Sequence, residues 1–129
     1  MLQRWKIVYY ENSDSFSEVF EFIDAQNGRN KAKIFNWLSL LEEKGPLLPR
    51  PYADLLRNGI HELRLKLSGN QIRILYFFCY QEFIVLTNSF TKNIKKVPER
   101  EISKALKYKV DFLNCYTEKK LRGEYDENI

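Results

Sequence analysis

The sequence is poor in the residues that bind metals and form disulfides. Among 129 residues there are two cysteines, Cys79 and Cys115, and a single histidine, His61. The cysteines are far apart and form no CxxC pair, and these three side chains cannot build a standard zinc site. We therefore expect no metal and no cofactor, and two free thiols suited to a reducing cytoplasm, which is the predicted location.

Long apolar runs are also missing. The longest, from Ile72 to Tyr80, is interrupted by Arg73 and is much too short to span a membrane. No long apolar core follows the first residues, so no signal peptide is expected. The sequence therefore predicts a protein without a membrane partner.

Aromatic and basic residues are plentiful. Aromatic side chains make up 15% of the chain, which favours a packed globule over a disordered chain. We expect one domain over residues 1–117 and a frayed C-terminal tail over 118–129. The net charge of +4 suits a nucleic-acid or acidic-protein partner, although many ordinary domains share it.

Hydrophobic patterns predict strands and helices in a definite order. Ser15 and Glu18 fit a capping box that begins a helix, and Asn27-Gly28 fits its end. Three prolines exclude regular structure from the connector over 45–52, and residues 55–59 turn the chain into a sheet. The predicted elements are a strand over 5–10, helices over 15–27 and 30–44, strands over 60–67, 71–80 and 82–90, and a last helix from 98. The buried stripe of that last helix is expected to contain Ile102, Ala105, Leu106, Val110 and Leu113.

This order predicts an α+β fold with an N-terminal strand, two helices, a three-stranded antiparallel meander and a C-terminal helix. Short connections between the last three strands imply antiparallel pairing, with the helices packed on one face of the sheet. The other face would carry exposed basic residues from the meander, flanked by a basic loop. These residues are Arg64, Lys66 and Arg73 on the sheet and Lys92, Lys95 and Lys96 in the loop.

The first two strands of the meander form a hairpin whose register can be predicted. A turn at Ser68-Gly69-Asn70 joins two strands in which apolar and polar residues alternate. Apolar residues must share a face, which pairs Leu65 with Ile72 and sets Arg64 opposite Arg73. Two adjacent arginines repel each other unless an anion lies across them, so this pair suggests a surface that handles phosphate. The alternative is a solvated sheet face with salt bridges to Glu62.

The segment from Lys92 to Lys109 is the most basic part of the chain. Seven Lys or Arg against two Glu give it a charge of +5. For Lys95 and Lys96 we expect electrostatic steering of a nucleic acid rather than chemistry.

Four segments follow one another along the second half of the chain: LLRNGIHELR from Leu55, RILYF from Arg73, FTK from Phe90 with Lys95-Lys96, and PEREI from Pro98. In this order they resemble the RelE/ParE toxin superfamily, and within it the phage-derived HigB-like branch of type II toxin–antitoxin systems. The resemblance covers nearly the whole chain up to about Tyr116. The chain departs from many relatives at two points, because Asn93 follows Lys92 and because Val97-Pro98 replaces an aromatic residue or histidine.

The resemblance implies a ribosome-dependent mRNA endonuclease that arrests translation. An antitoxin, often one with a helix-turn-helix DNA-binding domain, would inhibit it. Such toxins cleave RNA without metal, by attack of the ribose 2′-hydroxyl on the adjacent phosphate. Carried over by position, the implied catalytic residues are Arg73, Arg64 and Lys92.

Cleavage of this kind requires a proton acceptor, stabilisation of the phosphorane charge and a proton donor. Arg73 would clamp the phosphate with its planar guanidinium, and Arg64 would share that role or protonate the leaving oxygen. Either Lys92 or the RNA-binding Lys66 would be the base, and Glu62 would orient the arginines or serve as the base instead. The competing hypothesis is a ParE-like toxin that poisons DNA gyrase by binding it without catalysis.

Overall fold

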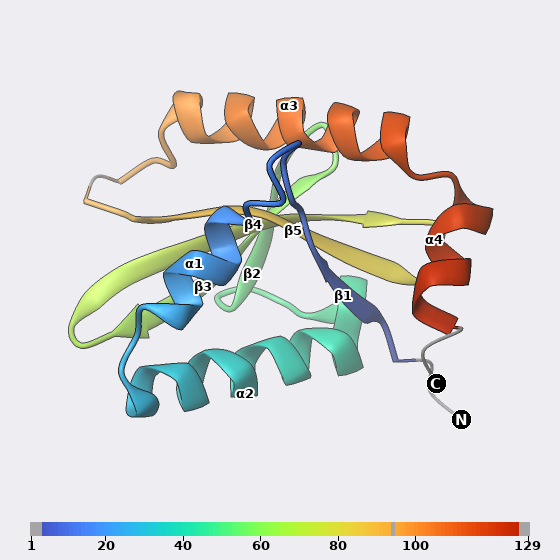
Figure 1. The fold of residues 1–129 in the computed structure, drawn as a ribbon. Helices are drawn as coiled ribbons and strands as arrows, with labels where there is room; N and C mark the ends of the chain where they lie inside the picture. The colour runs from blue at the N-terminus through green and yellow to red at the C-terminus, as the bar shows by residue number, and fades with distance from the viewer. Residues whose placement is uncertain (1–3, 94, 127–129) are drawn as a thin grey trace.

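A computed structural model describes residues 4–93 and 95–126 as a mixed five-stranded sheet with helices on both faces (Figure 1). The α+β class predicted from the sequence is therefore confirmed. In chain order the elements are β1 (Lys6–Tyr9), α1 (Glu18–Asp24), α2 (Gly28–Lys44), the 3₁₀ helix η1 (Gly45–Leu47), β2 (Ala53–Arg57), β3 (Ile60–Leu67), β4 (Asn70–Cys79), β5 (Phe83–Thr91), α3 (Glu99–Cys115) and α4 (Glu118–Asp126). None of the helices in these two described ranges is long and apolar enough to cross a membrane.

The sheet extends the predicted meander by one strand at each edge. Its order is β1-β5-β4-β3-β2, with β1 parallel to β5 and the other neighbours antiparallel. Of the residues expected to turn the chain into the sheet, 55–57 belong to the edge strand β2, which pairs with β3, and Asn58 and Gly59 form the turn. Two adjacent leucines, Leu55 and Leu56, hide the alternation that normally identifies a half-buried strand.

The β3–β4 hairpin has the predicted register. Leu65 pairs with Ile72 and Arg64 pairs with Arg73. The loop is Ser68-Gly69, with φ angles of 49° and 85°, and Asn70 already belongs to β4. A two-residue loop in which both residues have positive φ matches the right-handed twist of the flanking strands. Such a loop fixes the register of β3 against β4.

The prediction that all helices pack on one face of the sheet is wrong. Helices α1 and α2 cover the face that carries Leu63 and Ile74, whereas α3 and α4 cover the face that carries Leu75 and Phe77 (Figure 1). Both faces of β4 are apolar over several consecutive residues. Such a strand is stable only when both of its faces are buried.

Helix starts differ from the predicted ones because other side chains cap them. Ser17, not Ser15, is the N-cap of α1 and accepts a hydrogen bond from Phe20 N at 3.1 Å. Asn27 caps α2 by accepting from Asn30 N at 2.8 Å, so this helix begins at Gly28. Residues predicted to end one helix therefore begin the next.

The buried stripe of α3 is rotated from the predicted one. Ile102 and Ala105 are buried as expected, but Val110 is 61% exposed and Phe112 takes its place in the core. A repeat of 3.6 residues leads from Ile102 and Ala105 to Lys109 and Phe112, and the ammonium of Lys109 lies 5.7 Å from the Phe77 ring centroid. Of the other predicted members, Leu106 is half-buried and Leu113 is exposed.

The C-terminal segment is not frayed over residues 118–126. It forms α4, and Leu121 is fully buried among residues of the α3 side of the sheet. Residues 127–129, also expected to fray, lie outside the described residues. Leu121, the edge contact of Tyr125 with Phe83 at 5.8 Å and the ion pair of Arg122 with Glu82 at 2.8 Å dock a helix that is mostly polar.

Candidate functional site

The two arginines predicted to meet are brought together, and a carboxylate lies between them. Arg73 Nε is 2.9 Å from Glu62 Oε1, and Arg64 Nη2 is 3.4 Å from Glu62 Oε2. Glu62 comes from β3 on the same face, two residues before Arg64. The anion needed to hold two neighbouring arginines is therefore supplied by the chain itself.

Arg73 is buried, which corrects the expectation of an exposed side chain. It is 6% exposed because it lies on β4, between β3 and β5, with Phe90 directly opposite. Its Nη1 donates to the carbonyl oxygen of Ile72 at 3.0 Å and to Gln71 Oε1 at 3.5 Å. Burial lowers the pKa of Arg73, an effect that Glu62 opposes and Arg64 reinforces.

Arg64 joins this cluster to a second ion pair nearer the surface. Its Nη2 is 3.4 Å from Asp54 Oδ2, and Asp54 also binds Arg50 at 2.9 Å. The hydrogen bond from Arg50 is the main cause of a lowered Asp54 pKa, which burial opposes. The Arg64 side chain is 31% exposed, while its buried Nε lacks a hydrogen-bond partner within the described part of the chain. Arg64 is therefore the arginine of the pair that an outside phosphate can approach.

A hollow of about 380 Å³ lies beside this cluster, at the edge of β3 beyond the end of β2. The hairpin lines it with Arg64, Lys66, Gln71 and Arg73, and Lys33 and Trp37 of α2 and Pro51 complete it.

Two contacts build this hollow from segments far apart in the sequence. Lys33 Nζ donates to the carbonyl oxygen of Lys66 at 2.6 Å, so α2 is tied to the free edge of the sheet. The rings of Trp37 and Tyr52 pack with centroids 5.3 Å apart. Sequence reasoning missed Lys33, Trp37 and Pro51, because their positions on the helix and connector carry no motif that points to the hairpin.

The basic residues after β5 lie at different distances from the arginines. Lys92 N donates to the carbonyl oxygen of Gln71 at 2.7 Å, and strand alternation from Phe90 places Lys92 on the same side as Arg73. Lys95 and Lys96 are exposed, and neither forms a contact with the arginine pair in the described residues. The structure thus gathers Arg64, Lys66 and Arg73, sets Lys92 beside them, and leaves the other two lysines apart.

His61 lies on the opposite face of the sheet from this site, as its alternation with Glu62 predicts. Its ring stacks on Tyr76, with centroids 5.3 Å apart. Burial is the main cause of a lowered His61 pKa, and Lys109 adds to it while Asp54 opposes it. In the described ranges, no three His, Cys, Asp or Glu side chains come together in a way that could hold a metal ion.

Residues 21–109 match the family described as phage-derived protein Gp49-like (DUF891), and the chain belongs to this family. It is a RelE-like toxin family, and membership implies an antitoxin as a partner. No curated protein matches the sequence.

Proposed function

We propose that this chain is a type II toxin of the HigB-like branch that cleaves mRNA on the ribosome and so arrests translation. The observation that carries the proposal is the grouping of Arg64, Lys66 and Arg73 around one hollow at an open sheet edge. A helix-turn-helix antitoxin, the partner type suggested by the resemblance, would hold this activity in check. The proposed location is the cytoplasm, where mRNA is translated.

The two arginines have different tasks in this proposal because their surroundings differ. Arg64, whose side chain is 31% exposed against 7% for Arg73, binds the scissile phosphate. Arg73 is held by Glu62 and by the Ile72 carbonyl, so its guanidinium is fixed before the substrate arrives. Its contacts within the described residues use Nε and Nη1, and Nη2 remains for an oxygen that gains charge in the phosphorane. Fixed donors of this kind stabilise a transition state without reorganisation.

Cleavage follows from attack by the RNA itself. A base removes the 2′-hydroxyl proton, the 2′-oxygen attacks phosphorus, and the bond from phosphorus to the 5′-oxygen breaks as that oxygen takes up a proton. Lys66 is exposed at the hollow and Lys92 lies next to Gln71, so either lysine can approach the 2′-hydroxyl. Glu62 is 3% exposed and bound to both arginines, which favours orientation of the arginines as its role.

Mapping of RNA ends in cells tests this function. We expect wild-type protein, once induced, to produce new 5′ ends inside translated codons, and Arg64→Gln to produce few or none. Lys119→Gln, a change of the same charge on the exposed face of α4, should leave the ends unchanged. Growth arrest without new ends would contradict the proposal and favour a ParE-like toxin that binds gyrase.

A further inference from the structure

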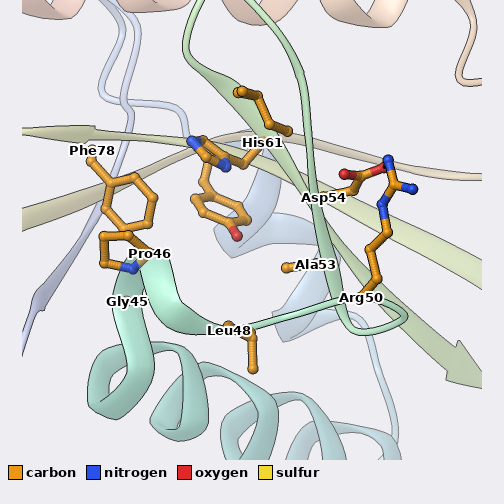
Figure 2. A pocket seen from close by; sticks show the side chains of 10 residues that line it. Gly45, Pro46, Leu48, Arg50, Ala53, Asp54, His61 and Phe78 are labelled. Atoms are coloured by element: carbon orange, nitrogen blue, oxygen red, sulfur yellow. Dashed lines mark ion pairs between the residues drawn. The ribbon is translucent and has the colours of Figure 1, made fainter.

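A second hollow, of about 220 Å³, lies on the α2 face of the sheet beside β2 (Figure 2). His61 and Phe78 line it from the sheet, and Pro46 and Leu48 line it from the segment that leads out of α2. Arg50 and Asp54 lie together at one side of it. None of the residues assigned to cleavage lines this hollow.

One wall of this pocket is a continuous aromatic surface. The rings of His61 and Tyr76 stack with an interplanar angle of 16°, and Phe78 meets His61 edge-on with centroids 5.0 Å apart. Tyr76 and Phe78 are also in edge contact, at 5.6 Å. Because the Phe78 ring is nearly perpendicular to the other two, at 79° and 89°, the three rings form an aromatic corner, and a planar group can make face and edge contacts with such a corner.

The pocket also contains polar groups that the protein does not satisfy. Tyr76 is 1% exposed, and its hydroxyl has no hydrogen-bond partner among the described residues; neither have the ring nitrogens of His61. Burial raises the pKa of Tyr76 and lowers that of His61, so both side chains are uncharged at neutral pH. Neither the Tyr76 hydroxyl nor a His61 ring nitrogen is among the fully buried atoms of the described residues that lack a partner, so each is open to the hollow and can hydrogen-bond to an occupant in place of water.

The volume of the pocket and its polar groups indicate which kind of molecule can occupy it. The volume is below the roughly 300–1,000 Å³ of pockets for drug-sized ligands, so a single planar ring system fits better than a larger molecule. An aliphatic side chain of a partner protein would leave the Tyr76 hydroxyl and the His61 nitrogens unsatisfied. A nucleobase has apolar faces for contact with the aromatic rings and a polar edge for these groups, and proteins bind unstacked bases through contacts of both kinds.

Charge connects this pocket to the arginine site. Arg50, whose side chain is 75% exposed, binds Asp54, and Asp54 also contacts Arg64. The connector that carries Arg50 and Pro51 therefore separates the two hollows, with Arg50 lining one and Pro51 the other. A nucleic-acid strand that crosses this connector would contact Arg50 at the His61 hollow and Arg64 at the arginine hollow.

We propose that the His61–Tyr76 pocket binds one base of the RNA, unstacked from the strand whose phosphate lies at Arg64. This inference rests on the proposed function and adds a source of sequence preference to it. The pocket would favour cleavage at sites that place a suitable base one or a few nucleotides from the scissile bond.

His61 is the only histidine of the chain, so its ring proton on Cε1 gives an unambiguous NMR signal from the pocket. The probe is a set of four single-stranded RNA hexamers, one for each base, with 2′-O-methyl groups that prevent attack on the phosphate. We expect at least one hexamer to shift the His61 signal in a saturable way. Tyr76→Phe should weaken that binding about 5–10-fold, the loss of one hydrogen bond of roughly 1–1.4 kcal/mol.

Tyr125→Phe is the matched control, because it removes another tyrosine hydroxyl, on α4 at the other face of the sheet. It should leave hexamer affinity unchanged. If hexamers bind without moving the His61 signal, and if Lys66→Gln weakens that binding, this inference is overturned and the proposed function stands. Absence of all hexamer binding would overturn this inference, whereas the proposed function is overturned only by absence of new 5′ ends in cells. A His61 signal that moves with protein concentration alone would assign the pocket to a second copy of the chain.

Discussion

At the scale of single residues, the site depends on one buried carboxylate that forms ion pairs with two arginines. Glu62 contacts both Arg64 and Arg73, and it is 3% exposed. The register of the hairpin could be predicted from alternation, and with it the meeting of the two arginines. The burial of Arg73 could not, because it depends on β5 packing along the other side of β4, which no local pattern in the hairpin encodes.

Arg73→Ala is expected to destabilise the fold by about 3 kcal/mol. Removing one partner of a buried ion pair typically costs about 3–5 kcal/mol, and we expect the lower end because Arg64 still contacts Glu62. Urea denaturation measures the change. This variant is therefore a poor test of catalysis, since loss of activity would follow from loss of fold.

The double variant Glu62→Gln/Arg73→Met provides the control for that prediction. It removes both charges of the pair, so it should recover much of the stability that Arg73→Ala loses. An Arg73→Ala protein as stable as the wild type would show that the pair with Glu62 contributes little.

His61 is expected to make stability depend on pH below about 6.5. Its pKa is lower in the folded protein than the ordinary value of 6.5, mainly through burial. The unfolded chain therefore binds a proton first, so stability is full above pH 6.5 and falls as pH drops toward the folded-state value. Urea midpoints at pH 7.5 and 5.5 should differ more for the wild type than for His61→Gln. Equal pH dependence in the two proteins would contradict this account.

At the scale of elements, the segments with strong periodicity or turn chemistry could be predicted and the polar or short ones could not. The hairpin has clear alternation and a Ser-Gly turn, and α2 has a regular apolar stripe. By contrast, β2 has five residues and lies at an edge, and α4 shows only Leu121 as a buried apolar anchor. Such elements form because a neighbouring surface accepts them, which is tertiary information.

Leu121→Ala is expected to destabilise the protein by about 2–5 kcal/mol, since it leaves a cavity where a fully buried leucine packs under α4. Lys119→Ala, on the exposed side of the same helix, should change stability by less than about 0.5 kcal/mol. Thermal or urea unfolding measures both. Equal stability of the two variants would mean that α4 contributes nothing to the fold and that residues 118–126 behave as the tail expected from the sequence.

At the scale of the whole molecule, the sheet separates two environments at its β3 edge. The α3 side carries Arg64 and Arg73, although Lys33 and Trp37 of α2 help to line their hollow, and the α2 side carries the His61 pocket. The net charge of +4 understates the local field, because the segment from Lys92 to Lys109 alone carries +5. We expect this basic segment to draw RNA toward the arginine site over distances of about a Debye length.

Salt dependence of RNA binding measures that contribution. Each phosphate contact on a single strand adds about 0.7 to the slope of log K against log salt concentration. Replacing both Lys95 and Lys96 by Gln should reduce the slope by about 1.4, whereas the same change at the exposed Lys119 and Lys120 should not alter it. An unchanged slope in the first variant would mean that the loop after β5 contacts no phosphate.

The central claim is that Arg64 and Arg73, beside the hollow at the edge of β3, cleave mRNA, and a single-turnover cleavage rate on programmed ribosomes tests it most directly. The comparison is between wild type, Arg64→Gln and Lys119→Gln, each first shown to be folded. We expect Arg64→Gln to slow cleavage by about 10²–10³-fold, the loss typical of one fixed donor, and Lys119→Gln to match the wild type. Equal rates in all three proteins would contradict the assignment of the site, and no cleavage by the wild type would contradict the function.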